Sequence, residues 1–159
     1  MTVSDTKQLL NEFGLTPNRA LGQNFLCDSA VLDAMIASLP QGPGILEIGP
    51  GLGALTERLL GHAPRVVAVE LDAAMIAVLQ ARFLGDPKLT LIHADFLKTD
   101  LDGVAAILEP PYAVAANLPY YVTTPICLRL LSDPRITHMT LMLQAEAAQR
   151  FFAEPGSRI

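Results

Sequence analysis

Five short apolar runs recur along the chain at intervals that leave room for a helix in each connection. They cover residues 44–48, 65–70, 89–93, 112–117 and 138–144, and their starts lie 21 to 26 residues apart. Each run is continuously apolar rather than alternating, which is typical of strands that are buried on both faces of a parallel sheet. The sequence therefore predicts an α/β fold with a doubly wound, mainly parallel sheet.

Amphipathic segments between the runs predict the helices. Asp28 and Asp72 precede helical patterns that extend to residues 39 and 83, and aspartate is a favoured N-cap. Shorter helices are expected over residues 54–60, 101–108 and 125–131. Two more are expected outside the strand region, near residues 5–13 and over 145–152.

The length of 159 residues fits one domain. We expect an N-terminal arm over residues 1–40 and a core over residues 41–159. A fifth strand with no outer neighbour would leave an open edge, so we expect the sequence to be a fragment whose sheet stops after that strand.

Composition narrows the class of protein. Hydrophobic residues make up 51% of the chain and charged residues 17%, which excludes a disordered chain. The polar N-terminus and the lack of a long apolar run predict a soluble, cytoplasmic protein with no membrane segment. Two distant cysteines and three scattered histidines predict no disulfide framework and no metal site. The net charge of −5 argues weakly against a nucleic-acid partner.

A glycine-rich loop follows the first predicted strand. Gly49, Gly51 and Gly53 are spaced as G-x-G-x-G, which differs from the G-x-G-x-x-G pattern of dinucleotide sites. Glycines here allow a tight turn and a close approach of the backbone to a ligand. The alternative is a strand-to-helix turn that serves packing alone.

Several carboxylates accompany this loop. Glu70 ends the second predicted strand and Asp95 follows the third, at the edge where open α/β sheets bind ligands. With Glu47 and Asp72 they would repel a pyrophosphate but attract a ligand that carries an ammonium, a sulfonium and an adenosine. We interpret Glu70 and Asp95 as ligands of S-adenosylmethionine. Asp72 is interpreted as a helix cap and Glu47 as a turn or supporting residue.

The fourth predicted strand ends in Asn117, Leu118, Pro119 and Tyr120. The Asn117 side-chain oxygen and the Leu118 carbonyl could accept both hydrogens of an exocyclic base amine, which localises its lone pair toward a methyl group. Proline fixes the bend, and Tyr120 could stack on the base. Such catalysis consists mostly of positioning and needs no general base. An ordinary strand-end turn is the alternative.

Taken together, these motifs resemble the ribosomal RNA adenine N6,N6-dimethyltransferase family over about residues 21–150. The matching segments occur in order: Leu21-Gly22-Gln23-Asn24-Phe25-Leu26, the 47–53 loop, Glu70-Leu71-Asp72, Asp95, Asn117-Leu118-Pro119-Tyr120 and Gln144-Ala145-Glu146. Thr123-Thr124-Pro125 is similar to the small-subunit enzyme, whereas macrolide-resistance enzymes, which modify large-subunit rRNA, tend to have an acidic residue in place of Pro125. Without the resemblance, residues 23–26 would be predicted as a loop with Phe25 in the core.

The resemblance implies a Rossmann-like class I methyltransferase that uses S-adenosylmethionine and releases S-adenosylhomocysteine. It would dimethylate N6 of two adjacent adenosines in a hairpin near the 3′ end of small-subunit rRNA, within a pre-30S particle, during ribosome biogenesis. The implied cofactor residues are Asn24 and Leu26 in the arm, Gly49 and Gly51 at the methionine part, Glu70 at the ribose, Asp95 at the adenine amine and Asn117 at the methyl group.

The chain also departs from that family. The family continues with further strands and a C-terminal helical domain, which are absent here, and Ala145 stands where a basic residue is common. We expect the full-length protein to be a monomer. The alternatives are a non-catalytic ribosome-assembly or RNA-binding module, a large-subunit rRNA enzyme of the macrolide-resistance type, and a methyltransferase for DNA adenine or protein glutamine.

Overall fold

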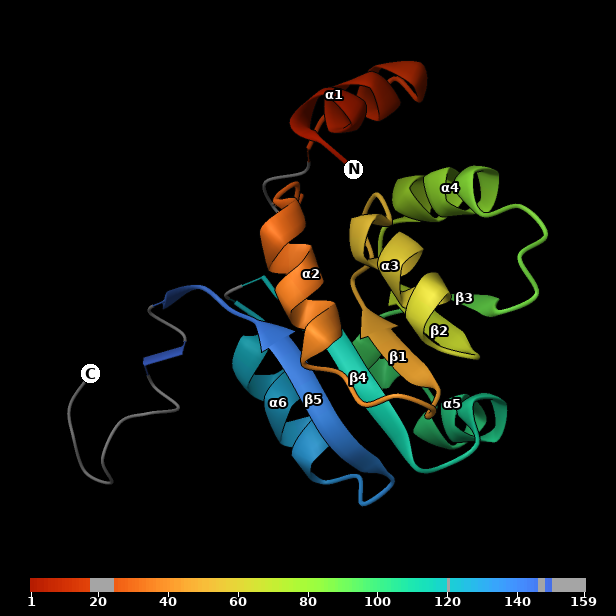
Figure 1. The fold of residues 1–159 in the computed structure, drawn as a ribbon, viewed down its shortest axis with the longest axis vertical. Coiled ribbons are helices and arrows are strands. Elements are labelled where there is room, and N and C mark those ends of the chain that lie inside the picture. Colours follow the sequence, from red (N-terminus) through yellow and green to blue (C-terminus); the bar gives the residue numbers. More distant parts are fainter. Residues whose placement is uncertain (18–24, 120, 146–147, 150–159) are drawn as a thin grey trace.

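A five-stranded parallel sheet forms the centre of the chain (Figure 1). The computed structural model describes residues 1–17, 25–119, 121–145 and 148–149. The strands are β1 (Ile45–Ile48), β2 (Val66–Glu70), β3 (Leu89–His93), β4 (Tyr112–Asn117) and β5 (Ile136–Met142). Their order across the sheet is β3-β2-β1-β4-β5, so the order reverses between β1 and β4. At such a switch point open α/β sheets bind their ligands.

Helices cover both faces of the sheet, which confirms the doubly wound expectation. The helices are α1 (Val3–Glu12), α2 (Ser29–Ala37), α3 (Ala54–His62), α4 (Ala73–Arg82), α5 (Leu101–Leu108) and α6 (Thr123–Leu131), with a 3₁₀ turn η2 (Phe96–Lys98) after β3. One hydrophobic cluster joins α2 and α3 to one face, and another joins α5 and α6 to the opposite face. Such a division is expected where parallel strands are joined by right-handed crossovers and the strand order reverses within the sheet.

Two helices begin at the aspartate N-caps that the sequence predicts. The carboxylate of Asp28 accepts hydrogen bonds from the backbone N–H of Ala30 and Val31, at 2.8 and 3.3 Å. That of Asp72 accepts one from Ala74 N–H at 2.9 Å. Asp72 is therefore the cap of α4, as interpreted from the sequence.

Two strand predictions need correction. The last strand begins at Ile136 rather than at residue 138, because Arg135 O accepts from Tyr112 N–H and pairing with β4 starts directly after the turn. β3 and β5 are also only partly buried, whereas the sequence predicts strands covered on both faces. They are the outer strands, and among the described residues no strand pairs with their outer sides.

The predicted helix over residues 145–152 lies mostly outside the described residues. α2 ends at Ala37 rather than at residue 39, and α3 extends to His62 rather than to residue 60. Differences of this size are usual at helix ends. Within the described ranges, no helix is long and apolar enough to span a membrane.

Candidate functional site

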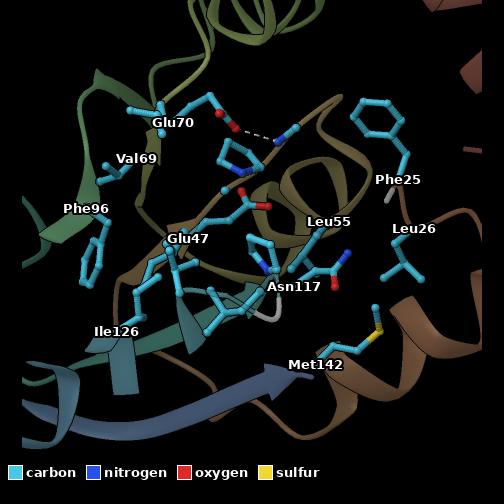
Figure 2. Close-up of a pocket in the computed structure, with 18 of the residues that line it drawn as sticks. Phe25, Leu26, Glu47, Leu55, Val69, Glu70, Phe96, Asn117, Ile126 and Met142 are labelled. Carbon is cyan, nitrogen blue, oxygen red and sulfur yellow. Dashed lines mark hydrogen bonds between the residues drawn. The ribbon is translucent and has the colours of Figure 1, made fainter. Parts of the chain in front are cut away.

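A cavity of about 480 Å³ opens at the carboxyl-terminal edge of the sheet (Figure 2). Its walls come from the glycine loop after β1, the ends of β2, β4 and β5, the segment after β3, and the N-terminal arm. Of the predicted site residues, the structure brings together Leu26, Gly49, Gly51, Glu70, Asp95, Asn117, Leu118 and Pro119. Asn24 and Tyr120 lie outside the described residues. The volume is within the usual range for small-molecule sites.

The glycine loop depends on left-handed backbone at three positions. Gly49, Gly51 and Gly53 have φ angles of 67°, 56° and 83°. Residues other than glycine rarely adopt such positive φ angles. At Gly51 a Cβ would also lie 3.3 Å from two ring carbons of Phe25. Phe25 packs beside the cluster of Leu10, Leu52, Met75 and Val78 and also lines the cavity. The arm residue is therefore half-buried over the loop rather than enclosed in the core.

Glu70 connects this loop to β2. Its Oε2 accepts from the Gly51 N–H at 3.0 Å, the dashed line in Figure 2, and its Oε1 accepts from the Asp72 N–H at 2.9 Å. Burial raises the pKa of Glu70, while these backbone hydrogen bonds oppose that change. Each carboxylate oxygen can accept a further hydrogen bond, so a diol at the cavity wall could still be bound.

Glu47 lies on β1 rather than in the turn, and it is one of the residues that line the cavity. It is 1% exposed, and its Oε2 accepts from the Thr56 hydroxyl of α3 at 2.7 Å. Burial raises the pKa of Glu47 to about 8, and the carboxylate of Glu70 acts in the same direction. The sequence does not indicate Thr56, because nothing local shows that its hydroxyl would meet a buried carboxyl.

Asp95 begins the segment after β3. Its Oδ1 accepts from the Leu97 N–H at 3.0 Å and so caps η2, while its Oδ2 lies 3.9 Å from Lys98 Nζ. Asp95 and the adjacent Phe96 both line the cavity. Its assignment as a cofactor ligand stays a prediction.

Asn117 ends β4, and the turn that follows is held by backbone contacts. Leu118 N–H donates to Met142 O of β5 at 3.1 Å. Pro119 O accepts from the buried Thr123 hydroxyl at 3.1 Å. The sequence alone did not connect this turn with β5. Met142 could have been found only from the strand order, which places the carboxyl end of β5 beside that of β4.

Comparison with known proteins shows which family and which relatives this chain is similar to. A family model described as ribosomal RNA adenine dimethylase matches residues 14–159. Two curated relatives are both named ribosomal RNA small subunit methyltransferase A. The one from Shouchella clausii is 43% identical over 166 residues, covering 99% of this chain and 55% of the relative. The one from Geobacter sulfurreducens is 46% identical over 150 residues, covering 91% and 54%.

Solved structures show the same similarity. The 23S rRNA methyltransferase ErmE superposes with a TM-score of 0.70 at 30% identity, covering 79% of this chain and 50% of that one. A dimethyladenosine transferase from Plasmodium falciparum superposes with a TM-score of 0.68 at 28% identity, covering 84% and 47%. The chain spans about half the length of the curated relatives it matches.

Proposed function

The chain belongs to the ribosomal RNA adenine dimethylase family, and on that premise we propose that it carries the cofactor-binding half of a small-subunit rRNA adenine N6,N6-dimethyltransferase. The observation that carries the proposal is the convergence of Glu70, the glycine loop and Asn117 on one cavity. The proposed substrate is a pair of adjacent adenosines near the 3′ end of small-subunit rRNA. The proposed setting is a pre-30S particle in the cytoplasm, with the full-length protein acting as a monomer.

The cavity fits S-adenosylmethionine chemically. The acidic side chains of Glu70 and Asp95 line it, and no lysine or arginine is among its described lining residues. A cationic sulfonium and an ammonium are favoured in such surroundings. When bound, the cofactor supplies a methyl group carried on sulfur. Glu70 would accept hydrogen bonds from its ribose, and Asp95 one from its adenine amine.

The turn after β4 would present the acceptor. The Asn117 side-chain oxygen and the Leu118 carbonyl accept the two hydrogens of the target amine, and Tyr120 stacks on the base. Leu118 N–H is already bound to Met142, and Pro119 O to Thr123, so the turn is held before any base arrives. Catalysis on this account depends on positioning, with no side chain required to remove a proton in the rate-limiting step.

A large-subunit rRNA substrate is the second candidate, because ErmE superposes well on this chain. The experiment is methylation of small-subunit particles and of large-subunit rRNA by the complete protein, with mass spectrometry of the digested nucleosides. Dimethyladenosine in small-subunit rRNA alone supports the proposal. Methylation of large-subunit rRNA alone, or of neither RNA, contradicts it.

The cofactor assignment predicts a loss of affinity on changing Glu70. Glu70→Ala should weaken S-adenosylmethionine binding at least about tenfold, since hydrogen bonds to a charged acceptor contribute about 1.5 to 3 kcal/mol each. Titration calorimetry measures the change. Glu57→Gln, an exposed site on α3, is the control and should bind as the wild type does. Unchanged affinity in a folded Glu70 variant would exclude the ribose role.

A substitution at Asn117 should affect the rate of methyl transfer more than the affinity for the cofactor. If its side chain acts mainly on the amine and methyl group, Asn117→Ala should lower kcat by orders of magnitude while changing cofactor affinity much less. Single-turnover methylation and calorimetry on the same preparation provide the two values. Equal losses in both would place Asn117 among the cofactor ligands instead.

A further inference from the structure

Arg129 of α6 contacts the segment that follows β3 at three points. Its Nη1 donates to the carbonyl of Leu97 and its Nη2 to the carbonyl of Thr99. Its guanidinium carbon lies over the Phe96 ring, 5.5 Å from the centroid. A guanidinium has donors in a fixed fork, which suits two carbonyls at once, whereas a lysine has one ammonium centre. The contact therefore fixes both ends of η2 relative to α6.

The segment held in this way is also hydrogen-bonded to Asp95. Leu97, whose carbonyl Arg129 binds, donates its own N–H to Asp95 Oδ1 at 3.0 Å. Thr99, the other residue bound by Arg129, donates its hydroxyl to Asp95 O at 3.0 Å. Arg129 thus reaches both the side chain and the backbone of Asp95 through one intermediate residue each.

The same helix also contacts the opposite part of the cavity. Thr123, the first residue of α6, donates to Pro119 O of the turn after β4, and Ile126 lines the cavity beside Phe96 (Figure 2). Arg129 itself does not line the cavity. The direct contacts of Arg129 with the cavity wall are to the Asp95–Thr99 segment, through Phe96, Leu97 and Thr99.

We propose that Arg129 is a positioning residue for the adenine end of the cofactor, because it holds the Asp95–Thr99 segment so that the Asp95 carboxylate faces the cavity. The inference rests on the proposed function, in which Asp95 accepts a hydrogen bond from the adenine amine. Its consequence is specific: loss of Arg129 weakens selection for adenine, and not only the overall binding of the cofactor.

The experiment compares two ligands that differ at the position Asp95 would contact and, as a consequence, in whether the neighbouring ring nitrogen N1 carries a hydrogen. S-adenosylhomocysteine carries the amine, and S-inosylhomocysteine carries an oxygen there. A site that is built to bind an amine discriminates against an analogue that lacks it. In the complete protein, Arg129→Met should reduce the ratio of the two affinities about fivefold, with Arg129→Lys in between. Calorimetry measures both dissociation constants.

Arg65→Met is the matched control. Arg65 also donates to a backbone carbonyl, that of Ile107 at 3.2 Å, but at the start of β2, away from the cavity. This variant should leave the ratio unchanged even if it lowers stability, so a ratio that falls equally in both variants overturns the proposal.

Asp95→Asn distinguishes this inference from the proposed function. If that variant lowers the ratio and folded Arg129→Met and Arg129→Lys do not, Arg129 has no positioning role and the cofactor assignment stands. If Asp95→Asn leaves the ratio unchanged, the adenine assignment of Asp95 is wrong, and the proposal for Arg129 is overturned with it.

Discussion

The pKa of the Glu47 carboxyl group lies far above its ordinary value. It is buried on β1 with one hydroxyl donor, Thr56, and its pKa is raised to about 8 by burial. The folded chain therefore favours the protonated form, while the unfolded chain has a carboxyl with the ordinary value of 4.5. Stability contributed through this group is greatest at low pH and declines as the pH rises from about 4.5 to about 8.

The first prediction concerns this pH dependence. Glu47→Gln removes the ionisation and keeps an acceptor for Thr56, so the variant should gain stability relative to the wild type by on the order of 1 kcal/mol per pH unit above about pH 5. Urea unfolding of the ligand-free protein between pH 5 and pH 8 measures the difference. Glu12→Gln, at an exposed position of α1, is the control. Parallel stability profiles for wild type and Glu47→Gln would contradict the raised pKa.

Among the elements, the starts of β4, β5 and α5 are joined by one polar network. Asp133 accepts from the Tyr112 hydroxyl at 3.2 Å and from Arg135 Nε and Nη2, both at 2.8 Å. Arg135 also reaches Asp102 of α5 at 2.7 Å. The hydrogen bonds from Arg135 hold the pKa of Asp133 down at about 2, and burial raises that of Tyr112 to about 12. The network lies at the edge of the sheet opposite the cavity.

Removing a member of this network should lower the stability of the folded chain, because the network joins the starts of β4 and β5. Asp133→Asn should lower the unfolding free energy by about 2 kcal/mol at pH 7. Because the pKa of Asp133 is lowered in the folded state, this contribution is present above about pH 4 and disappears toward pH 2, so the two proteins should converge there. Denaturant titrations at several pH values test this. Asp102→Asn, 88% exposed, should cost less than about 1 kcal/mol. Equal losses in both variants would show that burial of Asp133 does not matter.

At the scale of the whole molecule, β5 forms one of the two outer edges of the sheet. β5 pairs only with β4 among the described residues, and its Met139 and Leu141 are partly exposed. On the neighbouring α6, Leu128 and Leu131 are 64% and 65% exposed. An unpaired apolar edge strand is a template for pairing with another chain.

We therefore expect the 159-residue chain to associate with itself in a concentration-dependent way. Thr137→Lys and His138→Lys, at exposed positions of β5, should shift the population toward the monomer, since charge on an edge strand opposes pairing. Gln80→Lys, exposed on α4, adds the same charge elsewhere and should have no effect. Light-scattering masses over a range of concentrations measure this. A wild-type chain that is monomeric throughout would contradict the expectation.

Much of the fold could be predicted because its signals are local. The continuous apolar runs predicted five parallel strands, and Asp28 and Asp72 cap the helices that they were expected to begin. The position of the start of β5 was wrong by two residues. Thr137, one of the two missed residues, is a polar residue that an outer strand tolerates, and no local pattern shows which strand is outermost. The net charge of −5 argues weakly against a nucleic-acid partner, whereas the family model that the chain matches is described as ribosomal RNA adenine dimethylase.

By itself, the sequence indicated the glycine loop, Glu70, Asp95 and Asn117 as members of the candidate site, since glycine spacing and strand-end polar residues are properties of short segments. Only the tertiary structure decided how these residues are held. The strand order places β5 beside β4, so Met142 binds Leu118, and the packing of α6 on η2 brings Arg129 to Leu97 and Thr99. Each such contact joins residues more than twenty positions apart, whose meeting depends on how helices and strands pack rather than on any local pattern.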